Sequence, residues 1–169
     1  KIMKDQLLNV FSPKCINTAV KSILKVLDLN EIDLVFLDYE KPSKFVSSAN
    51  DCHLNVWVQC NHEGGGAISG WIIGEDPKQR FIEAQFHTVW CSPDGKLQDI
   101  TPRTDGEKTI MFFPDPTRRI SFFEHDGNAA ICTYNSVKML NQVLISKIEK
   151  MNIISTSDFA INHGFYTPK

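Results

Sequence analysis

The chain has 169 residues, of which 42% are hydrophobic and 22% are charged, and its formal net charge is −2. This composition is typical of one soluble globular domain, so we expect a single domain over residues 1–169 with a motif-bearing core at residues 48–116. Acidic and basic residues are interspersed, which excludes the basic surface of a non-specific nucleic-acid binder, and the apolar runs are too short to span a membrane.

The chain contains five scattered cysteines and no Cys-x-x-Cys pair: Cys15, Cys52, Cys60, Cys91 and Cys132. A chain of this length can build a hydrophobic core without disulfides. We therefore expect free thiols in a reducing compartment, the cytoplasm, with delivery into another cell as an effector or toxin as the alternative.

The first predicted elements are a helix and a short strand. The helix is indicated by a 3.6-residue apolar period, with Asn17 or Thr18 as its cap, and the period is formed by Val20, Ile23, Leu24 and Leu27. Residues 32–37 are typical of a short buried strand, and residues 41–48 of a loop.

The middle of the chain predicts a second helix followed by a sheet. Ser48, Asn50 and Asp51 are N-cap residue types before a helix over residues 52–60, and Gly64-Gly65-Gly66 ends it. The predicted strands that follow cover residues 67–74, 81–91, 96–101, 109–113 and 120–123.

The last third of the chain predicts a helix of about four turns. Its amphipathic stripe is formed by Val137, Leu140, Val143, Leu144, Ile148 and Met151. The whole pattern predicts an α+β fold, with an antiparallel sheet of about four or five strands and helices at both ends.

Three residues in the centre of the chain have the chemistry of a cysteine nucleophile and its helpers. Cys52 lies in the first turn of the second predicted helix, where free N–H groups and the helix dipole favour the reactive thiolate. His87 can take the thiol proton, and Asp99 can orient the imidazole from the next strand. Backbone N–H groups at the helix start are the expected oxyanion donors, with Asn50 and Asn55 as candidate side-chain donors.

The turn at residues 92–95 determines whether His87 and Asp99 can meet. Its sequence, Ser-Pro-Asp-Gly, favours a three-residue hairpin loop with a bulge at Gly95. In that register Val89 faces Asp99, and His87 is the diagonal neighbour of Asp99 on the same side of the sheet, about 7–8 Å away at the backbone. A two-residue loop would instead place His87 on the opposite face.

This arrangement predicts a hydrolase or acyl transferase that acts on an amide of a protein or peptide and needs no cofactor. Deamidation, transglutamination and peptide cleavage share the same thioester chemistry, and all three stay open. We expect the residues that contact substrate to be Trp71, Trp90, Asn55 and His53.

Residues 51–116 resemble a family of uncharacterised bacterial proteins. The shared pattern is Cys-His-x-Asn-Val at residues 52–56, Gly-Gly at 64–65, Gly-Trp at 70–71, Glu-Ala-x-Phe-His-x-Val-Trp at 83–90, Ser-Pro-Asp-Gly at 92–95 and Leu-x-Asp-Ile-Thr-Pro at 97–102. The resemblance implies a common fold and no particular activity.

The order of Cys52, His87 and Asp99 is also similar to that of papain-like and transglutaminase-like enzymes, which carry Cys at a helix start and His and Asp or Asn on successive strands. This resemblance implies a papain-like core. The chain departs from the papain pattern, because Val46 stands where a Gln precedes the nucleophile by six residues and no Trp follows Cys52. This departure argues against peptidase activity more than it argues against a triad of Cys52, His87 and Asp99.

Two other classes of function stay open. A zinc protein would use Cys and His ligands around the same positions, namely Cys52, His53, His87 and Cys91, although their spacing matches no common zinc motif. A non-catalytic interaction module would instead present aromatic anchors in a groove, and the candidates are Trp57, Trp71 and Trp90.

Overall fold

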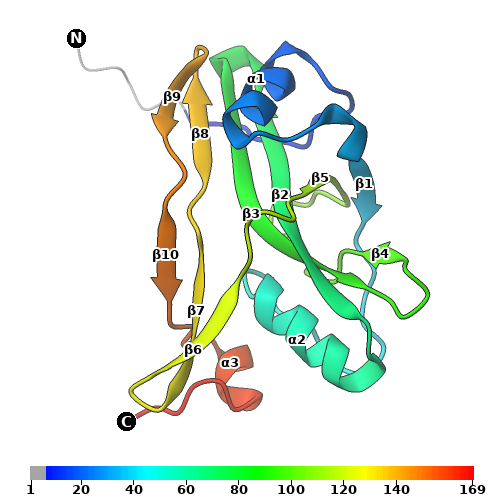
Figure 1. The fold of residues 1–169 in the computed structure, drawn as a ribbon, viewed down its shortest axis with the longest axis vertical. Helices are drawn as coiled ribbons and strands as arrows, with labels where there is room; N and C mark the ends of the chain where they lie inside the picture. Colours follow the sequence, from blue (N-terminus) through cyan, green and yellow to red (C-terminus); the bar gives the residue numbers. More distant parts are fainter. Residues whose placement is uncertain (1–6) are drawn as a thin grey trace.

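The computed structural model describes residues 7–169, and over these residues the protein has an α+β fold (Figure 1). The named strands pair antiparallel throughout. No helix in this part of the chain is long and apolar enough to cross a membrane.

In chain order the elements are α1 (Thr18–Leu27), η1 (Glu31–Asp33), β1 (Val35–Asp38), α2 (Cys52–Glu63), β2 (Gly66–Asp76), η2 (Pro77–Gln79), β3 (Phe81–Cys91), β4 (Leu97–Gln98), β5 (Thr109–Pro114), β6 (Ser121–His125), β7 (Asn128–Tyr134), β8 (Val137–Leu140), β9 (Val143–Ser146), β10 (Lys150–Ile153) and α3 (Asp158–Asn162). The predicted first and second helices are confirmed. Asn17 caps α1 by accepting a hydrogen bond from the backbone N–H of Val20, and Gly64, with φ of 73°, ends α2.

The predicted sheet of four or five strands is wrong in size. The main sheet has seven strands in the order β1-β5-β2-β3-β8-β9, with β4 paired to β3, and β10-β7-β6 form a second sheet of three strands. The extra strands come from the region after residue 127, where the sequence pattern did not predict strands.

The predicted C-terminal helix is also wrong, because its residues form β8, β9 and β10. In β8, Val137 and Met139 are buried and alternate with two less buried residues, which is the period of a strand. Asn141 and Gln142 both have positive φ, 49° and 63°, as in a type I′ turn, and Leu140 pairs with Val143 across it. The spacing of the apolar residues fits both a helical and a strand period. The turn at Asn141 and Gln142 makes the segment a β-hairpin rather than a helix.

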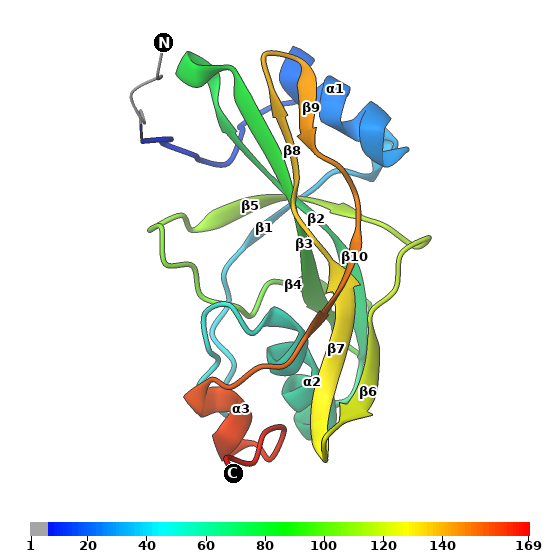
Figure 2. The ribbon, with the colours of Figure 1, turned by 90° about the vertical axis from the view of Figure 1, so that its left-hand side faces the viewer.

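The two ends of the elongated molecule are covered by different helices, as both ribbon views show (Figures 1 and 2). At one end, α1 packs its apolar stripe on the main sheet, in a core that includes Trp71, Ile73 and Phe113. At the other end, α2 contributes to two cores: Val56 packs with Trp90, while Leu54 and Val58 pack with residues of β7 and α3. The start of α2 is therefore held between the main sheet and the three-stranded sheet.

The edge of β3 is open where α2 approaches it. On this side β8 pairs with the first part of β3, up to Ala84, and β4 pairs with its last two residues, Trp90 and Cys91. Between them, residues 85–89 have no strand partner on this side within the described chain. This gap lets a helix start approach the side chains of β3 directly.

Candidate active site

Cys52 is the first residue of α2, and the N–H groups of this first turn are left without a side-chain cap. The N-cap residue Asp51 makes no capping hydrogen bond, and its Oδ1 instead accepts one from the hydroxyl of Ser155 at 2.9 Å. The first N–H groups of a helix lack partners within the helix and carry its partial positive charge. The helix start therefore presents donors and a favourable field for an anion beside the Cys52 thiol.

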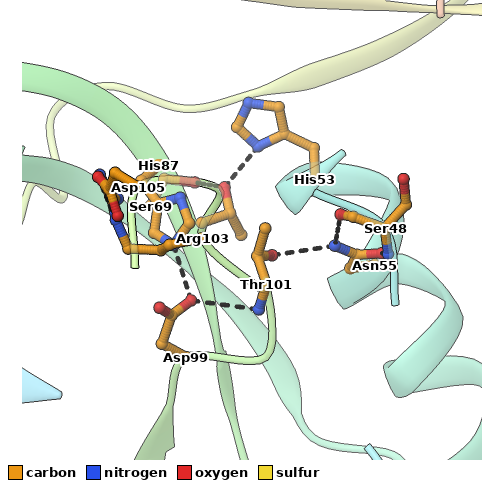
Figure 3. A network of polar contacts seen from close by, with 10 residues as sticks. Ser48, His53, Asn55, Ser69, His87, Asp99, Thr101, Arg103 and Asp105 are labelled. Atoms are coloured by element: carbon orange, nitrogen blue, oxygen red, sulfur yellow. Dashed lines mark hydrogen bonds and ion pairs between the residues drawn. The ribbon is translucent and has the colours of Figure 1, made fainter. Parts of the chain in front are cut away.

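His87 and Asp99 are hydrogen-bonded, with His87 Nε2 2.9 Å from Asp99 Oδ1 (Figure 3). Both residues are buried, at 7% and 1% exposed. The predicted register is confirmed: Trp90 pairs with Gln98 and Cys91 with Leu97, so the next pair along places Val89 opposite Asp99.

The turn at residues 92–95 also has the predicted form. Gly95 has φ of 87°, its N–H donates to the carbonyl of Ser92 at 2.8 Å, and the N–H of Ser92 donates to the carbonyl of Lys96 at 2.9 Å. These are the bonds of a three-residue hairpin loop with a bulge. The turn therefore sets the side of the sheet on which Asp99 lies.

The pKa of the Cys52 thiol responds to two imidazoles, those of His53 and His87. Burial acts to raise the pKa of the thiol, but the charges and hydrogen bonds of His53 and His87 outweigh it and hold the pKa well below its usual range. Cys52 nevertheless keeps some exposed surface. A partly accessible thiol with a lowered pKa has the properties of a reactive cysteine.

The pKa of His87 is raised to about 9. Burial acts to lower it, but the Cys52 thiolate and the hydrogen bond to Asp99 act in the opposite direction and prevail. Because Nε2 is used by Asp99, Nδ1 is the nitrogen left to face the thiol. The two groups thus favour a thiolate–imidazolium pair.

His53, the neighbour of Cys52, is fixed by two hydroxyl groups from different sheets. Its Nδ1 lies 2.7 Å from the Thr88 hydroxyl of β3, and its Nε2 lies 3.3 Å from the Thr133 hydroxyl of β7. The Thr88 hydroxyl also lies 3.0 Å from that of Ser69.

The side-chain amide of Asn55 is used in hydrogen bonds to neighbouring segments of the protein. Its amide accepts a hydrogen bond from the N–H of Ser48 and donates to the carbonyl of Ser48 and to the Thr101 hydroxyl, at 2.9, 2.8 and 3.0 Å. It is completely buried. Asn55 therefore ties the loop before Cys52 to the segment after Asp99, and it offers no surface to a substrate (Figure 3).

A cavity of about 410 Å³ opens beside Cys52 and His87. Its wall is rich in polar side chains from the loop before α2, from β3, from the segment between β4 and β5, and from the junction of β7 and β8, namely Asn50, Gln85, Thr104, Tyr134, Asn135 and Ser136. Arg103 and Asp105 also line it and form an ion pair with a shortest distance of 2.7 Å. Asn50, with φ of 66°, is the one candidate side-chain oxyanion donor that lines this cavity in the described chain.

The three tryptophans differ in exposure. Trp71 is completely buried and donates from Nε1 to Asp115 Oδ2 at 2.9 Å. Trp90 is 6% exposed and donates from Nε1 to the carbonyl of Gly64 at 2.9 Å. Both are core residues without an accessible face, whereas Trp57 is 45% exposed. The structure therefore does not place Trp71 or Trp90 where they could contact a substrate, and it does not present three tryptophans in one groove.

The proposed zinc ligands do not converge. Among the described residues no group of three His, Cys, Asp or Glu side chains is arranged to hold a metal ion. The Cys91 thiol instead lies 3.7 Å from the carbonyl of Ser92, at the hairpin turn. The residues Cys52, His53, His87 and Cys91 therefore do not fit a zinc site in this arrangement.

Several residues of the site carry no recognisable signal in the sequence. Thr133 lies 80 positions from His53 and reaches it only through the three-stranded sheet, which the sequence pattern did not predict. Arg103 and Asp105 are two residues apart in an irregular segment, and nothing in that spacing indicates a cavity wall.

No protein-family model, curated protein or solved structure matches the chain. The interpretation of this site therefore depends on the geometry and electrostatics of its own residues.

Proposed function

We propose that the protein is a cysteine-dependent amide hydrolase or acyl transferase, with Cys52 as nucleophile, His87 as general base and acid, and Asp99 as the group that orients His87. The observation that carries the proposal is the joint position of the three groups. Cys52 lies at an uncapped helix start, His87 Nε2 is bound to a buried carboxylate, and both Cys52 and His87 line one cavity.

The chemistry follows from these positions. The Cys52 thiolate attacks the amide carbonyl, and the N–H groups of the first turn of α2 stabilise the oxyanion. The His87 imidazolium gives its proton to the departing nitrogen, which leaves as ammonia or an amine, and a thioester remains on Cys52. His87 then deprotonates a water molecule that attacks the thioester, which releases the acid and the thiolate. A primary amine in place of water would give a new amide.

The polar wall of the cavity supports a carboxamide substrate such as the side chain of a protein glutamine. Amide and hydroxyl groups such as Gln85, Asn135 and Ser136 can donate to and accept from such a group. The order of a Cys at a helix start, a His on a strand and an Asp after the next turn is similar to that of papain-like and transglutaminase-like enzymes. A core of that type is part of the proposal.

The test is amide turnover by the purified protein. Peptides and proteins rich in glutamine are supplied, and released ammonia and incorporation of a fluorescent primary amine are measured. We expect one of these products from the parent protein and from Cys15→Ala, which changes an exposed thiol, and none from Cys52→Ala. Equal product from Cys52→Ala and the parent would overturn the proposal.

A second measurement needs no substrate. Site-resolved alkylation by iodoacetamide follows the thiolate population, so Cys52 should react far faster than Cys15 or Cys132 at about pH 6. His87→Ala should raise the pH at which Cys52 is half reactive. Equal rates at all three cysteines would show that Cys52 is an ordinary thiol.

A further inference from the structure

The strands β9 and β10 follow each other along one long side of the molecule, and together they form a free sheet edge (Figure 1). β9 lies at one edge of the main sheet and pairs with β8, and β10 lies at one edge of the three-stranded sheet and pairs with β7. Within residues 7–169 no strand pairs with the outer side of either strand. A free edge offers its unpaired N–H and C=O groups to another strand.

This edge exposes an unusual amount of apolar surface. Six large hydrophobic side chains in and directly after the two strands are 36–62% exposed, namely Val143, Leu144, Ile145, Met151, Ile153 and Ile154. The charged residues of the segment are confined to its centre, and they are Lys147, Glu149 and Lys150. Proteins usually protect a free edge with charges, proline or a covering segment, so an apolar edge of this kind indicates a surface that is covered in an assembly.

The backbone direction along the edge is fixed at Glu149. Its N–H donates to the side-chain carbonyl of Asn135 at 2.6 Å, and its C=O accepts from the N–H of Asn135 at 3.0 Å. Both backbone groups of Glu149 therefore point inward, to the junction of β7 and β8. Successive residues of a strand direct their backbone groups to opposite edges, so Ile148 and Lys150 direct theirs outward.

The sequence of the edge is complementary to itself in the antiparallel direction. When two copies are paired about Ile148, Lys147 of each copy faces Glu149 of the other, which gives two opposite-charge pairs beside the axis. The apolar pairs farther out are Ile145 with Met151 and Val143 with Ile153. Opposite charges and apolar side chains that face each other across an antiparallel pair stabilise it.

The adjacent registers lack this complementarity. The smallest shift that keeps outward backbone groups opposite each other moves the axis to Lys147 or to Glu149. Either shift sets a charged residue against its own copy, which destabilises the pair. The charge pairs also lie beyond the irregularity of β9, which falls between Leu144 and Ser146. The edge therefore specifies one register, with Ile148 on the axis.

We propose that the protein forms a homodimer in which the β9–β10 edges of two copies pair antiparallel about a two-fold axis at Ile148. One surface serves both copies, as a two-fold dimer requires. The inference goes beyond the proposed function and does not depend on it. Met151 belongs to the paired segment and also lines the cavity beside Cys52 and His87, so the second copy would lie next to that cavity.

The test measures the mass of the protein in solution by sedimentation velocity at micromolar concentrations. We expect a particle of two chains for the parent. Lys147→Glu should weaken the dimer by about tenfold or more, because by symmetry it turns two attractive pairs into two repulsive ones. The charge swap Lys147→Glu/Glu149→Lys should restore the dimer. Lys108→Glu makes the same charge change at an exposed position near β1, at the opposite edge of the main sheet, and should have no effect.

A carbodiimide cross-link tests the register, because it joins an amine to a carboxylate in contact with it. In an equilibrated mixture of isotope-labelled and unlabelled protein, we expect Lys147 of one copy to be joined to Glu149 of the other. A monomeric parent, or a dimer that Lys147→Glu leaves as tight as that of the parent, would overturn the proposal. A Lys147–Glu149 link confined to single chains would overturn it as well.

Discussion

At the scale of single residues, the proton of His87 is controlled by two anions, the Cys52 thiolate and the Asp99 carboxylate. Burial acts against a charged imidazole, so the pKa of about 9 depends on both partners. Because this pKa lies above that of an unperturbed histidine, the cationic ring is present in the neutral range and is lost as pH rises through about 9. Any activity that uses the His87 proton should therefore decline on the alkaline side of that value.

Asp99→Asn should lower the pKa of His87 by about one to two units, because the amide keeps a hydrogen bond but removes the negative charge. The measurement is a titration of the His87 ring nitrogens by NMR. Asp94→Asn, at an exposed position of the neighbouring turn, is the control and should leave the titration unchanged. A titration that is identical in parent and Asp99→Asn would mean that the carboxylate only positions the ring.

The sequence could predict the site only as far as local chemistry reaches. Three local features were enough to predict that Cys52, His87 and Asp99 lie near one another. They are a cysteine after N-cap residue types, a histidine in a predicted strand, and a Ser-Pro-Asp-Gly turn. The contacts of His53 with Thr133 and of Asn55 with Thr101 depend on segments far along the chain. No local pattern carries that information, and an asparagine that closes a loop has the same sequence signal as one that faces a substrate.

At the scale of elements, the hairpin between β3 and β4 carries Asp99 to His87. Gly95 has φ of 87° and open space around it, so a Cβ there meets no atom but strains the backbone. Gly127, in the turn between β6 and β7, has φ of 80° and equally open space. The two glycines thus form a matched pair, one close to the site along the chain and one in the other sheet.

Both Gly95→Ala and Gly127→Ala should lower the free energy of unfolding, each by about 1–2 kcal/mol, as measured by urea denaturation. Only Gly95→Ala should also raise the alkylation midpoint of Cys52, because relaxation of its turn displaces Asp99 and so weakens the support of His87. If neither variant changes the reactivity of Cys52, the hairpin does not control the site.

The elements that sequence patterns predicted well are those with a single consistent signal. The apolar stripe of α1 and the predicted strand over residues 81–91 agree with the caps and turns that bound them, and both elements are confirmed. Residues 137–151 carry two signals, because apolar residues spaced by three and four can also satisfy a strand period over a short run. The turn at Asn141 and Gln142 resolves the conflict in favour of strands, and an Asn followed by Gln rather than by Gly is a weak turn signal on its own.

At the scale of the whole molecule, distant segments are joined by a few buried polar groups. Asp115, which is 2% exposed, accepts hydrogen bonds from Trp71 of β2, from Thr117 and from Arg118, and Arg118 also donates to the carbonyl of Leu27 at the end of α1. One carboxylate therefore links α1, β2 and the end of β5. Burial acts to raise its pKa, but the hydrogen bonds from Thr117, Trp71 and Arg118 hold the pKa below its usual value.

Asp115→Asn should lower the free energy of unfolding at about pH 7 by roughly 2–4 kcal/mol, because the amide loses the charge that pairs with Arg118 and sets an N–H group against the other donors. A carboxyl group whose pKa is lower in the folded than in the unfolded chain stabilises the fold above its unfolded pKa, and this stabilisation disappears as pH falls through the folded value. The difference between parent and variant should therefore shrink as pH falls from about 7 to below the unperturbed aspartate pKa of about 4. Urea denaturation across this range measures it, with the exposed Asp33→Asn as a control that should have little effect at any pH. A difference that stays constant with pH would mean that Asp115 joins these segments through its shape and hydrogen bonds rather than through its charge.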